Sequence, residues 1–218
     1  MHLMAAWSAL PSHDLARLLG PPAAVLLAAI LPGRRVAALA ALLCAVGVGA
    51  MDELAAPPIV RAGWVALWLL VAWQSGALGH EPPRPPSVRR GAIESGAVAL
   101  PLGFGLLLLL LAALARQTLA PADARRASLG ALFVCAGLLH LMMRRHVRRA
   151  LVAFAALGLG LELLAAAARA TDVLHAGAPA GVALAGALGV VALTRRIAGA
   201  RERFAGSPLV GDAHELHD

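Results

Sequence analysis

Residues 137–167 read GLLHLMMRRHVRRALVAFAALGLGLELLAAA. The turn that holds Arg144, Arg145, Arg148 and Arg149 separates two apolar runs, 127–143 and 150–168. A segment in lipid has to satisfy its own backbone hydrogen bonds, and apolar runs of this length are too long for the strands of a membrane barrel. The pattern therefore predicts two membrane-spanning helices joined by a basic loop.

The composition of the whole chain indicates the same environment. Of its 218 residues, 60% are hydrophobic and 14% are charged, and the mean hydropathy is +0.78. A soluble domain is closer to half apolar and a quarter charged, and one core of this size cannot hide so much apolar surface. The net charge of +7 comes from arginines in short clusters between apolar runs, which is typical of membrane topology. We therefore expect lipids as partners and no nucleic acid.

The chain is predicted to form one all-α membrane domain, 1–218, with about seven transmembrane helices. Windows of about 20 residues place the helices at 15–32, 36–51, 57–79, 92–115, 127–143, 150–168 and 177–194. Prolines at Pro32, at Pro57 and Pro58, in the stretch 81–86 and at Pro121 mark the joints. Residues 195–218 are expected to form a polar cytoplasmic tail, so no room is left for a water-soluble catalytic domain.

The arginines predict the orientation of these helices. With seven spans, thirteen arginines fall on one side: Arg34, Arg35, Arg84, Arg89, Arg90, Arg144, Arg145, Arg148, Arg149, Arg195, Arg196, Arg201 and Arg203. Five fall on the other: Arg17, Arg116, Arg125, Arg126 and Arg169. Because arginine is retained on the cytoplasmic side, we expect the N-terminus outside and the C-terminus in the cytoplasm of a bacterial inner-membrane protein.

Glu162 is the clearest candidate for function, because a carboxylate inside a membrane helix is costly unless it is paired or hydrated. The nearest charge in the sequence is Arg169. Two roles are open: a neutral, protonated side chain packed against another helix, or a proton carrier whose pKa is raised by burial. His140 is the second proton-transfer candidate, placed to relay protons toward the Arg144 cluster or to serve as a hydrogen-bonded interfacial histidine.

Other polar residues predict less. Arg61 is expected to extend to the membrane surface or to pair with Asp52 or Glu53. Cys44 and Cys135 lie inside apolar runs without metal-binding spacing, and His214 and His217 in the tail are a weak metal signal. We therefore expect no catalytic residue, no metal and no bound cofactor.

The tryptophans and glycines predict helix contacts. Trp64 and Trp68 share one face of a helix, with Trp73 nearer its end, and we expect anchoring at the lipid interface or contact with a partner. Small residues let helices approach closely in lipid, although a high glycine content can also be compositional. The glycines concerned are Gly103, Gly105, Gly158, Gly160, Gly181, Gly186 and Gly189.

The stretch that begins at Gly137 resembles hydrogenase-4 component E, a relative of the small K-type membrane subunit of respiratory complex I. The matching features are Gly137-Leu138-Leu139 at the end of one helix, the basic turn Arg144-Arg145-His146 with Arg149, and the exit Thr194-Arg195-Arg196-Ile197. If Glu162 stands on the family's membrane glutamate, Leu163 and Leu164 replace the Asn and Gly that follow it. If Gly160 stands on the glycine instead, the glutamate is lost.

The resemblance implies a non-catalytic subunit, without metal or flavin, in the membrane arm of a redox-driven ion-translocating assembly. Its partners would be antiporter-like membrane subunits. Three hypotheses follow: a proton-coupling subunit with Glu162 as carrier, a purely structural subunit in which Glu162 serves packing, or a small stand-alone transporter. The sparse polar side chains within the apolar runs weigh against the last.

Overall fold

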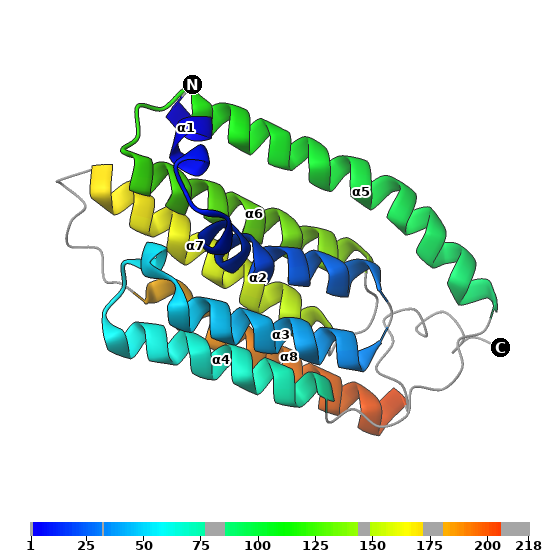
Figure 1. The fold of residues 1–218 in the computed structure, drawn as a ribbon. Helices are drawn as coiled ribbons and strands as arrows, with labels where there is room; N and C mark the ends of the chain where they lie inside the picture. The colour runs from blue at the N-terminus through cyan, green and yellow to red at the C-terminus, as the bar shows by residue number, and fades with distance from the viewer. Residues whose placement is uncertain (1, 32, 77–85, 144–148, 172–180, 206–218) are drawn as a thin grey trace.

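The computed structural model describes residues 2–31, 33–76, 86–143, 149–171 and 181–205 as an all-α bundle without strands (Figure 1). Its elements are α1 (His2–Ser8), α2 (Ser12–Ile30), α3 (Arg34–Ala50), the short 3-10 helix η1 (Asp52–Leu54), α4 (Pro58–Gly76), α5 (Pro86–Ala115), α6 (Pro121–Met143), α7 (Ala150–Thr171) and α8 (Val182–Ala205). Three of the helices begin at a proline, where the missing N–H costs no hydrogen bond.

Six of the described helices are long and apolar enough to cross a membrane, and this confirms an all-α polytopic bundle. They are α2, α4, α5, α6, α7 and α8. The remaining predicted segment, 36–51, corresponds to α3, whose 17 residues extend for about 25 Å, somewhat less than the roughly 30 Å of a hydrocarbon core. Each predicted segment therefore coincides with a helix, and α3 is the short one.

Three helices extend beyond the predicted membrane spans. The helix α2 begins at Ser12 and α5 at Pro86, ahead of the apolar residues that defined the spans. The helix α8 continues through Arg195 and Arg196 to Ala205, so the polar segment after residue 194 begins as helix rather than as tail. Hydropathy locates only the apolar part of a helix, whereas arginine and alanine are good helix formers beyond it.

The centre of the bundle is the antiparallel pair α6 and α7, whose membrane windows are 61% and 67% buried. Their backbones cross closely because glycines face each other: a Cβ at Gly160 would lie 2.7 Å from the carbonyl oxygen of Gly130. Further along, a Cβ at Gly137 would lie 2.9 Å from the carbonyl oxygen of Ala153. The expected small-residue contact is confirmed at Gly158 and Gly160, whereas Gly105, Gly186 and Gly189 have open space where a side chain would go.

The tryptophan prediction was wrong for two of the three residues. Trp64 and Trp68 are fully buried in the core rather than at a lipid interface, and Trp64 packs near Gly158 of α7. Trp73 is 65% exposed. The i, i+4 spacing placed Trp64 and Trp68 on one face correctly, but that face is the one that meets the other helices.

The helix α5 lies at the outside of the bundle. It packs mainly along α6, and Figure 1 shows it bending along the surface. Pro101 inside the helix removes one backbone hydrogen bond and accounts for a bend. Only 6% of the window Val98–Ala115 is buried, so Leu108, Leu109 and Phe104 present an open apolar face.

Candidate functional site

Glu162 lies on α7 and forms a buried ion pair. Its side chain is 1% exposed, and Arg169, two turns later on the same helix, reaches back so that its Nη2 lies 3.2 Å from Oε1 of the carboxylate. The Arg169 side chain is 18% exposed, which allows its far end to reach the edge of the apolar region. The nearest charge in the sequence is thus also the partner in space.

The carboxylate of Glu162 also holds the start of α8. The backbone N–H of Gly181 donates to both carboxylate oxygens, with N–O distances of 3.3 and 3.2 Å. Gly181 is the residue that precedes the first turn of α8, since its carbonyl accepts from the N–H of Ala185. A negative charge at this position is favoured by the unpaired N–H groups and the dipole of a helix N-terminus.

Gly181 is suited to this position for two reasons. Its φ of +92° is one that residues with a side chain rarely adopt, and a Cβ there would lie 3.2 Å from Cγ2 of Val60 in α4. The chain therefore brings a backbone N–H close to Glu162 where a larger residue would be strained. Glu162, Arg169 and Gly181 together form what we call the Glu162 clamp, which ties α7 to the beginning of α8.

The contacts of the Glu162 clamp are those that a carboxylate makes. A cation, a backbone donor and a helix N-terminus all stabilise a carboxylate more than a neutral carboxyl group. The neutral, protonated side chain considered from the sequence would leave Arg169 without its counter-charge in a buried place, which is costly. The contacts therefore fit a permanent structural charge better than a proton carrier.

His140 lies on α6 and is fully buried at the contact with α2. Its Nδ1 is 3.5 Å from the carbonyl oxygen of Val25, a long hydrogen bond. Gly130 of α6 lies against Gly160 and Leu164, on either side of Glu162 in α7, so His140 is ten residues further along α6. At 1.5 Å per residue, the two proton-transfer candidates are separated by about 15 Å along the bundle, too far for direct transfer.

The predicted cytoplasmic cluster is described only in part. Arg149 is 2% exposed at the start of α7, whereas Arg144, Arg145 and Arg148 lie outside the described residues. Arg149 is at the same end of the bundle as Arg195 and Arg196 of α8, because Leu151 and Arg195 line the same small cavity. We call this the basic end.

At the opposite end, carboxylates meet arginines from different helices. Arg125 of α6 lies 3.5 Å from Glu53 of η1, and Arg126 donates to the backbone carbonyl of Glu53 at 3.0 Å and pairs with Asp123. Arg17 of α2 lies 3.4 Å from Asp52. We call this the paired end.

The paired end corrects one prediction. Asp52 and Glu53 pair with Arg17 and Arg125, not with Arg61. The network was missed from the sequence, although its signal was present: the predicted topology puts the acidic pair 52–53 and the basic pair 125–126 on the same side of the membrane. Opposite charges in two loops on one side are candidates for such pairing.

Within the described ranges, no group of three or more His, Cys, Asp or Glu side chains could hold a metal ion. Cys44 and Cys135 are free and buried, and Sγ of Cys44 lies 3.5 Å from the carbonyl oxygen of Pro21 inside α2. His214 and His217 lie outside the described residues. The polar groups named above thus connect helices to one another rather than surrounding a reaction site.

No family model matches the chain, and no curated protein or solved structure is found to be similar to it. The class that the sequence and the fold define together is an all-α polytopic membrane protein.

Proposed function

We propose that this chain is a non-catalytic membrane subunit of a hetero-oligomeric, redox-driven ion-translocating assembly, of the hydrogenase-4 or complex I kind that its sequence resembles. Its place would be the bacterial inner membrane, among antiporter-like subunits. Its role there would be to scaffold and couple the larger subunits, while the proton path runs elsewhere.

The observation that carries this proposal is the Glu162 clamp. The carboxylate that would have to bind and release a proton is engaged by Arg169 and by the N–H of Gly181. The other candidate, His140, is about 15 Å away along the helix axis. A chain whose buried charges are used to hold helices together suits a structural subunit better than a pump or an enzyme.

The exposed apolar face of α5 supports the presence of a partner subunit. A helix that is only 6% buried across Val98–Ala115 contributes little to the bundle of its own chain. In an assembly, the same apolar face would pack against a helix of an antiporter-like subunit, since shape-matched packing drives helix association in lipid.

The direct test is purification of the tagged chain in a mild detergent, followed by mass spectrometry of the proteins that remain bound. The proposal expects antiporter-like and hydrogenase-like subunits in stoichiometric amounts. Recovery of the chain alone, with the same result after chemical cross-linking in the membrane, would contradict it.

A pair of glycine variants tests whether co-purification depends on the packing of the bundle. Gly160→Leu puts a side chain into the α6–α7 crossing and should abolish both folding and co-purification. Gly186→Leu adds the same side chain to α8 where nothing lies within 4 Å of a Cβ, and should leave both intact.

Glu162→Gln distinguishes scaffold from proton carrier. The amide retains a carbonyl oxygen that can accept from Gly181, and so some complex should still assemble. The proposal expects ion translocation per assembled complex to be unchanged. Normal assembly with a several-fold loss of translocation would instead assign the proton to Glu162.

A further inference from the structure

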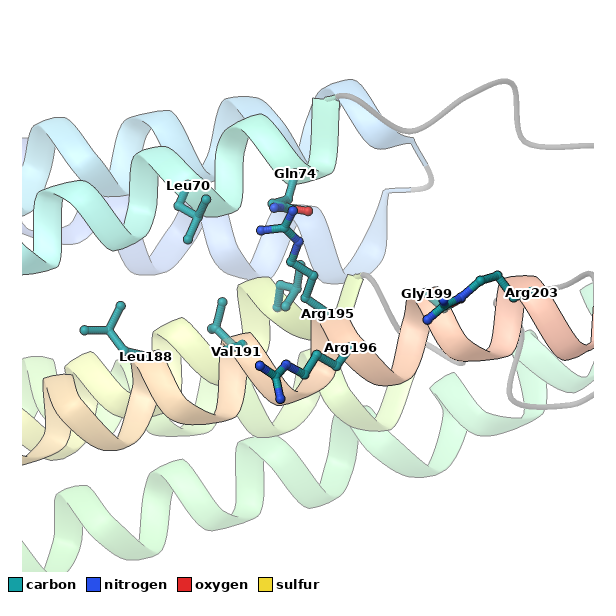
Figure 2. A pocket seen from close by; sticks show the side chains of 10 residues that line it. Leu70, Gln74, Leu188, Val191, Arg195, Arg196, Gly199 and Arg203 are labelled. Carbon is teal, nitrogen blue, oxygen red and sulfur yellow. The ribbon is translucent and has the colours of Figure 1, made fainter.

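At the basic end, a cavity of about 520 Å³ lies between α4, α7 and α8 (Figure 2). One part of its wall is apolar and is made by Leu70 of α4, Leu151 of α7, and Leu188 and Val191 of α8. Its volume is in the range of small-molecule sites. Leu188 is 42% exposed, so the apolar wall is open toward the surface of the bundle that faces lipid.

The other part of the wall is cationic. Arg195, Arg196 and Arg203 of α8 line the same cavity, and Figure 2 shows Arg195 extending toward Gln74 of α4. Arg195, Gly199 and Arg203 are four residues apart and therefore share one face of the helix. Nothing lies within 4 Å of the position that a Cβ would take at Gly199, between the two arginines.

These arginines differ from those of the paired end. Arg195 and Arg196 are exposed, and neither has a carboxylate partner within the part of the chain that the structure describes. Arg203 donates from Nε to the carbonyl oxygen of Gly199 at 3.1 Å, which leaves the rest of its guanidinium available. No acidic side chain is among the described residues that line the cavity. The site therefore has a concentrated positive charge next to an apolar wall.

We propose that this cavity binds an anionic phospholipid. The headgroup phosphate would lie among Arg195, Arg196 and Arg203, with the side-chain amide of Gln74 as a further hydrogen-bond donor. An acyl chain would run along Leu188 and Val191. Arginine pockets between membrane helices suit lipid phosphates, because the guanidinium group forms paired hydrogen bonds with phosphate oxygens.

The apolar wall is the reason for choosing a lipid over a free anion. A soluble phosphate would need only the arginines, and it would gain nothing from Leu70, Leu188 and Val191. A phospholipid uses both parts of the cavity and leaves its second chain in the bilayer. The inference does not depend on the proposed function, since it needs only the chain itself in a membrane.

The test is native mass spectrometry of the full, delipidated chain titrated with phosphatidylglycerol or with phosphatidylcholine of the same acyl chains. We expect a clear preference for phosphatidylglycerol. The variant R195Q/R196Q should weaken phosphatidylglycerol binding on the order of tenfold or more, because each basic group near an anionic lipid contributes substantially. The control R17Q/R116Q removes the same net charge at the other end and should bind like the parent chain.

Two further arms give the results that would overturn the inference. Leu188→Trp should fill the space beside the apolar wall and also weaken lipid binding. Thermal unfolding of each variant shows whether it is folded. Inorganic phosphate at millimolar concentration should not displace the lipid. Equal binding of the two lipids, equal loss in both double variants, or displacement by phosphate would each contradict a phospholipid site.

Discussion

The two ends of the bundle use the same amino acid in different ways. At the paired end and in the adjoining half of the bundle, Arg17, Arg125, Arg126 and Arg169 each lie next to a carboxylate. At the basic end, Arg195 and Arg196 have no such partner in the described structure. The pairs of Arg17 with Asp52 and of Arg125 with Glu53 join different elements, whereas the arginines of the basic end face the cavity for which we propose an anionic lipid.

The difference agrees with the arginine distribution that predicts the topology. On the predicted topology the outer side has five carboxylates for its five arginines, whereas the cytoplasmic side has six carboxylates for thirteen arginines and retains a net positive charge.

The largest expected effect is on accessibility from outside the cell. Arg116→Cys and Phe204→Cys each place a thiol at an exposed position, the first directly after α5 and the second, 90% exposed, at the basic end. In intact cells, a membrane-impermeant thiol reagent should label the cysteine at 116 and not the one at 204. The buried Cys44 and Cys135 provide the unlabelled background. Labelling at 204 alone would reverse the predicted orientation.

The next effect is on stability. Glu162→Leu leaves Arg169 without its counter-charge and Gly181 without its acceptor, and should lower the free energy of unfolding by about 3 kcal/mol. Arg195→Leu at the basic end should change it by less than about 0.5 kcal/mol, because no described contact is lost. Thermal or denaturant unfolding in detergent measures both.

A double variant tests the cause of this loss of stability. If the cost of Glu162→Leu comes from the stranded charge, E162L/R169L should recover part of the lost stability, because removing both partners is less costly than removing one. A double variant less stable than E162L would mean that Arg169 acts through some other contact.

The smallest effects are expected among the surface pairs. The Glu53 side chain is 11% exposed beside Arg125, and Glu53→Gln should cost roughly 1 kcal/mol. Asp52 is 84% exposed beside Arg17, so Asp52→Asn should cost only a few tenths of a kcal/mol, if anything. Unfolding in the same detergent compares the two, and an equal cost would mean that burial does not set the strength of these pairs.

Much of the fold could be predicted from the sequence, because lipid imposes helices of a minimum length and arginine clusters separate them. Which face of each helix is buried could not be predicted. In water, periodic apolar residues mark the buried face, but in lipid the exposed face is equally apolar. This is why Trp64 and Trp68 were expected at an interface and lie in the core, and why Gly160 is packed while Gly186 is open.

Only the part of the candidate site that lies on a single helix could be predicted. Glu162 is conspicuous within an apolar run, and Arg169 is its nearest charge along the chain. The third member of the clamp, Gly181, lies nineteen residues away and acts through its backbone, so no side-chain pattern predicts its role. The pairing of Glu53 with Arg125 likewise depends on the contact in space between η1 and the start of α6.

From its contacts with Arg169 and Gly181, we expect Glu162 to be a permanent negative charge that holds α7 and α8 together. Infrared spectroscopy of the purified chain in lipid, with Glu162→Gln as the reference, tests it most directly, because a protonated carboxyl group and a carboxylate absorb at separate frequencies. At neutral pH we expect the variant to lose carboxylate absorption and to lose no protonated-carboxyl band. A protonated-carboxyl band that disappears in Glu162→Gln would contradict the clamp and restore Glu162 as a proton carrier.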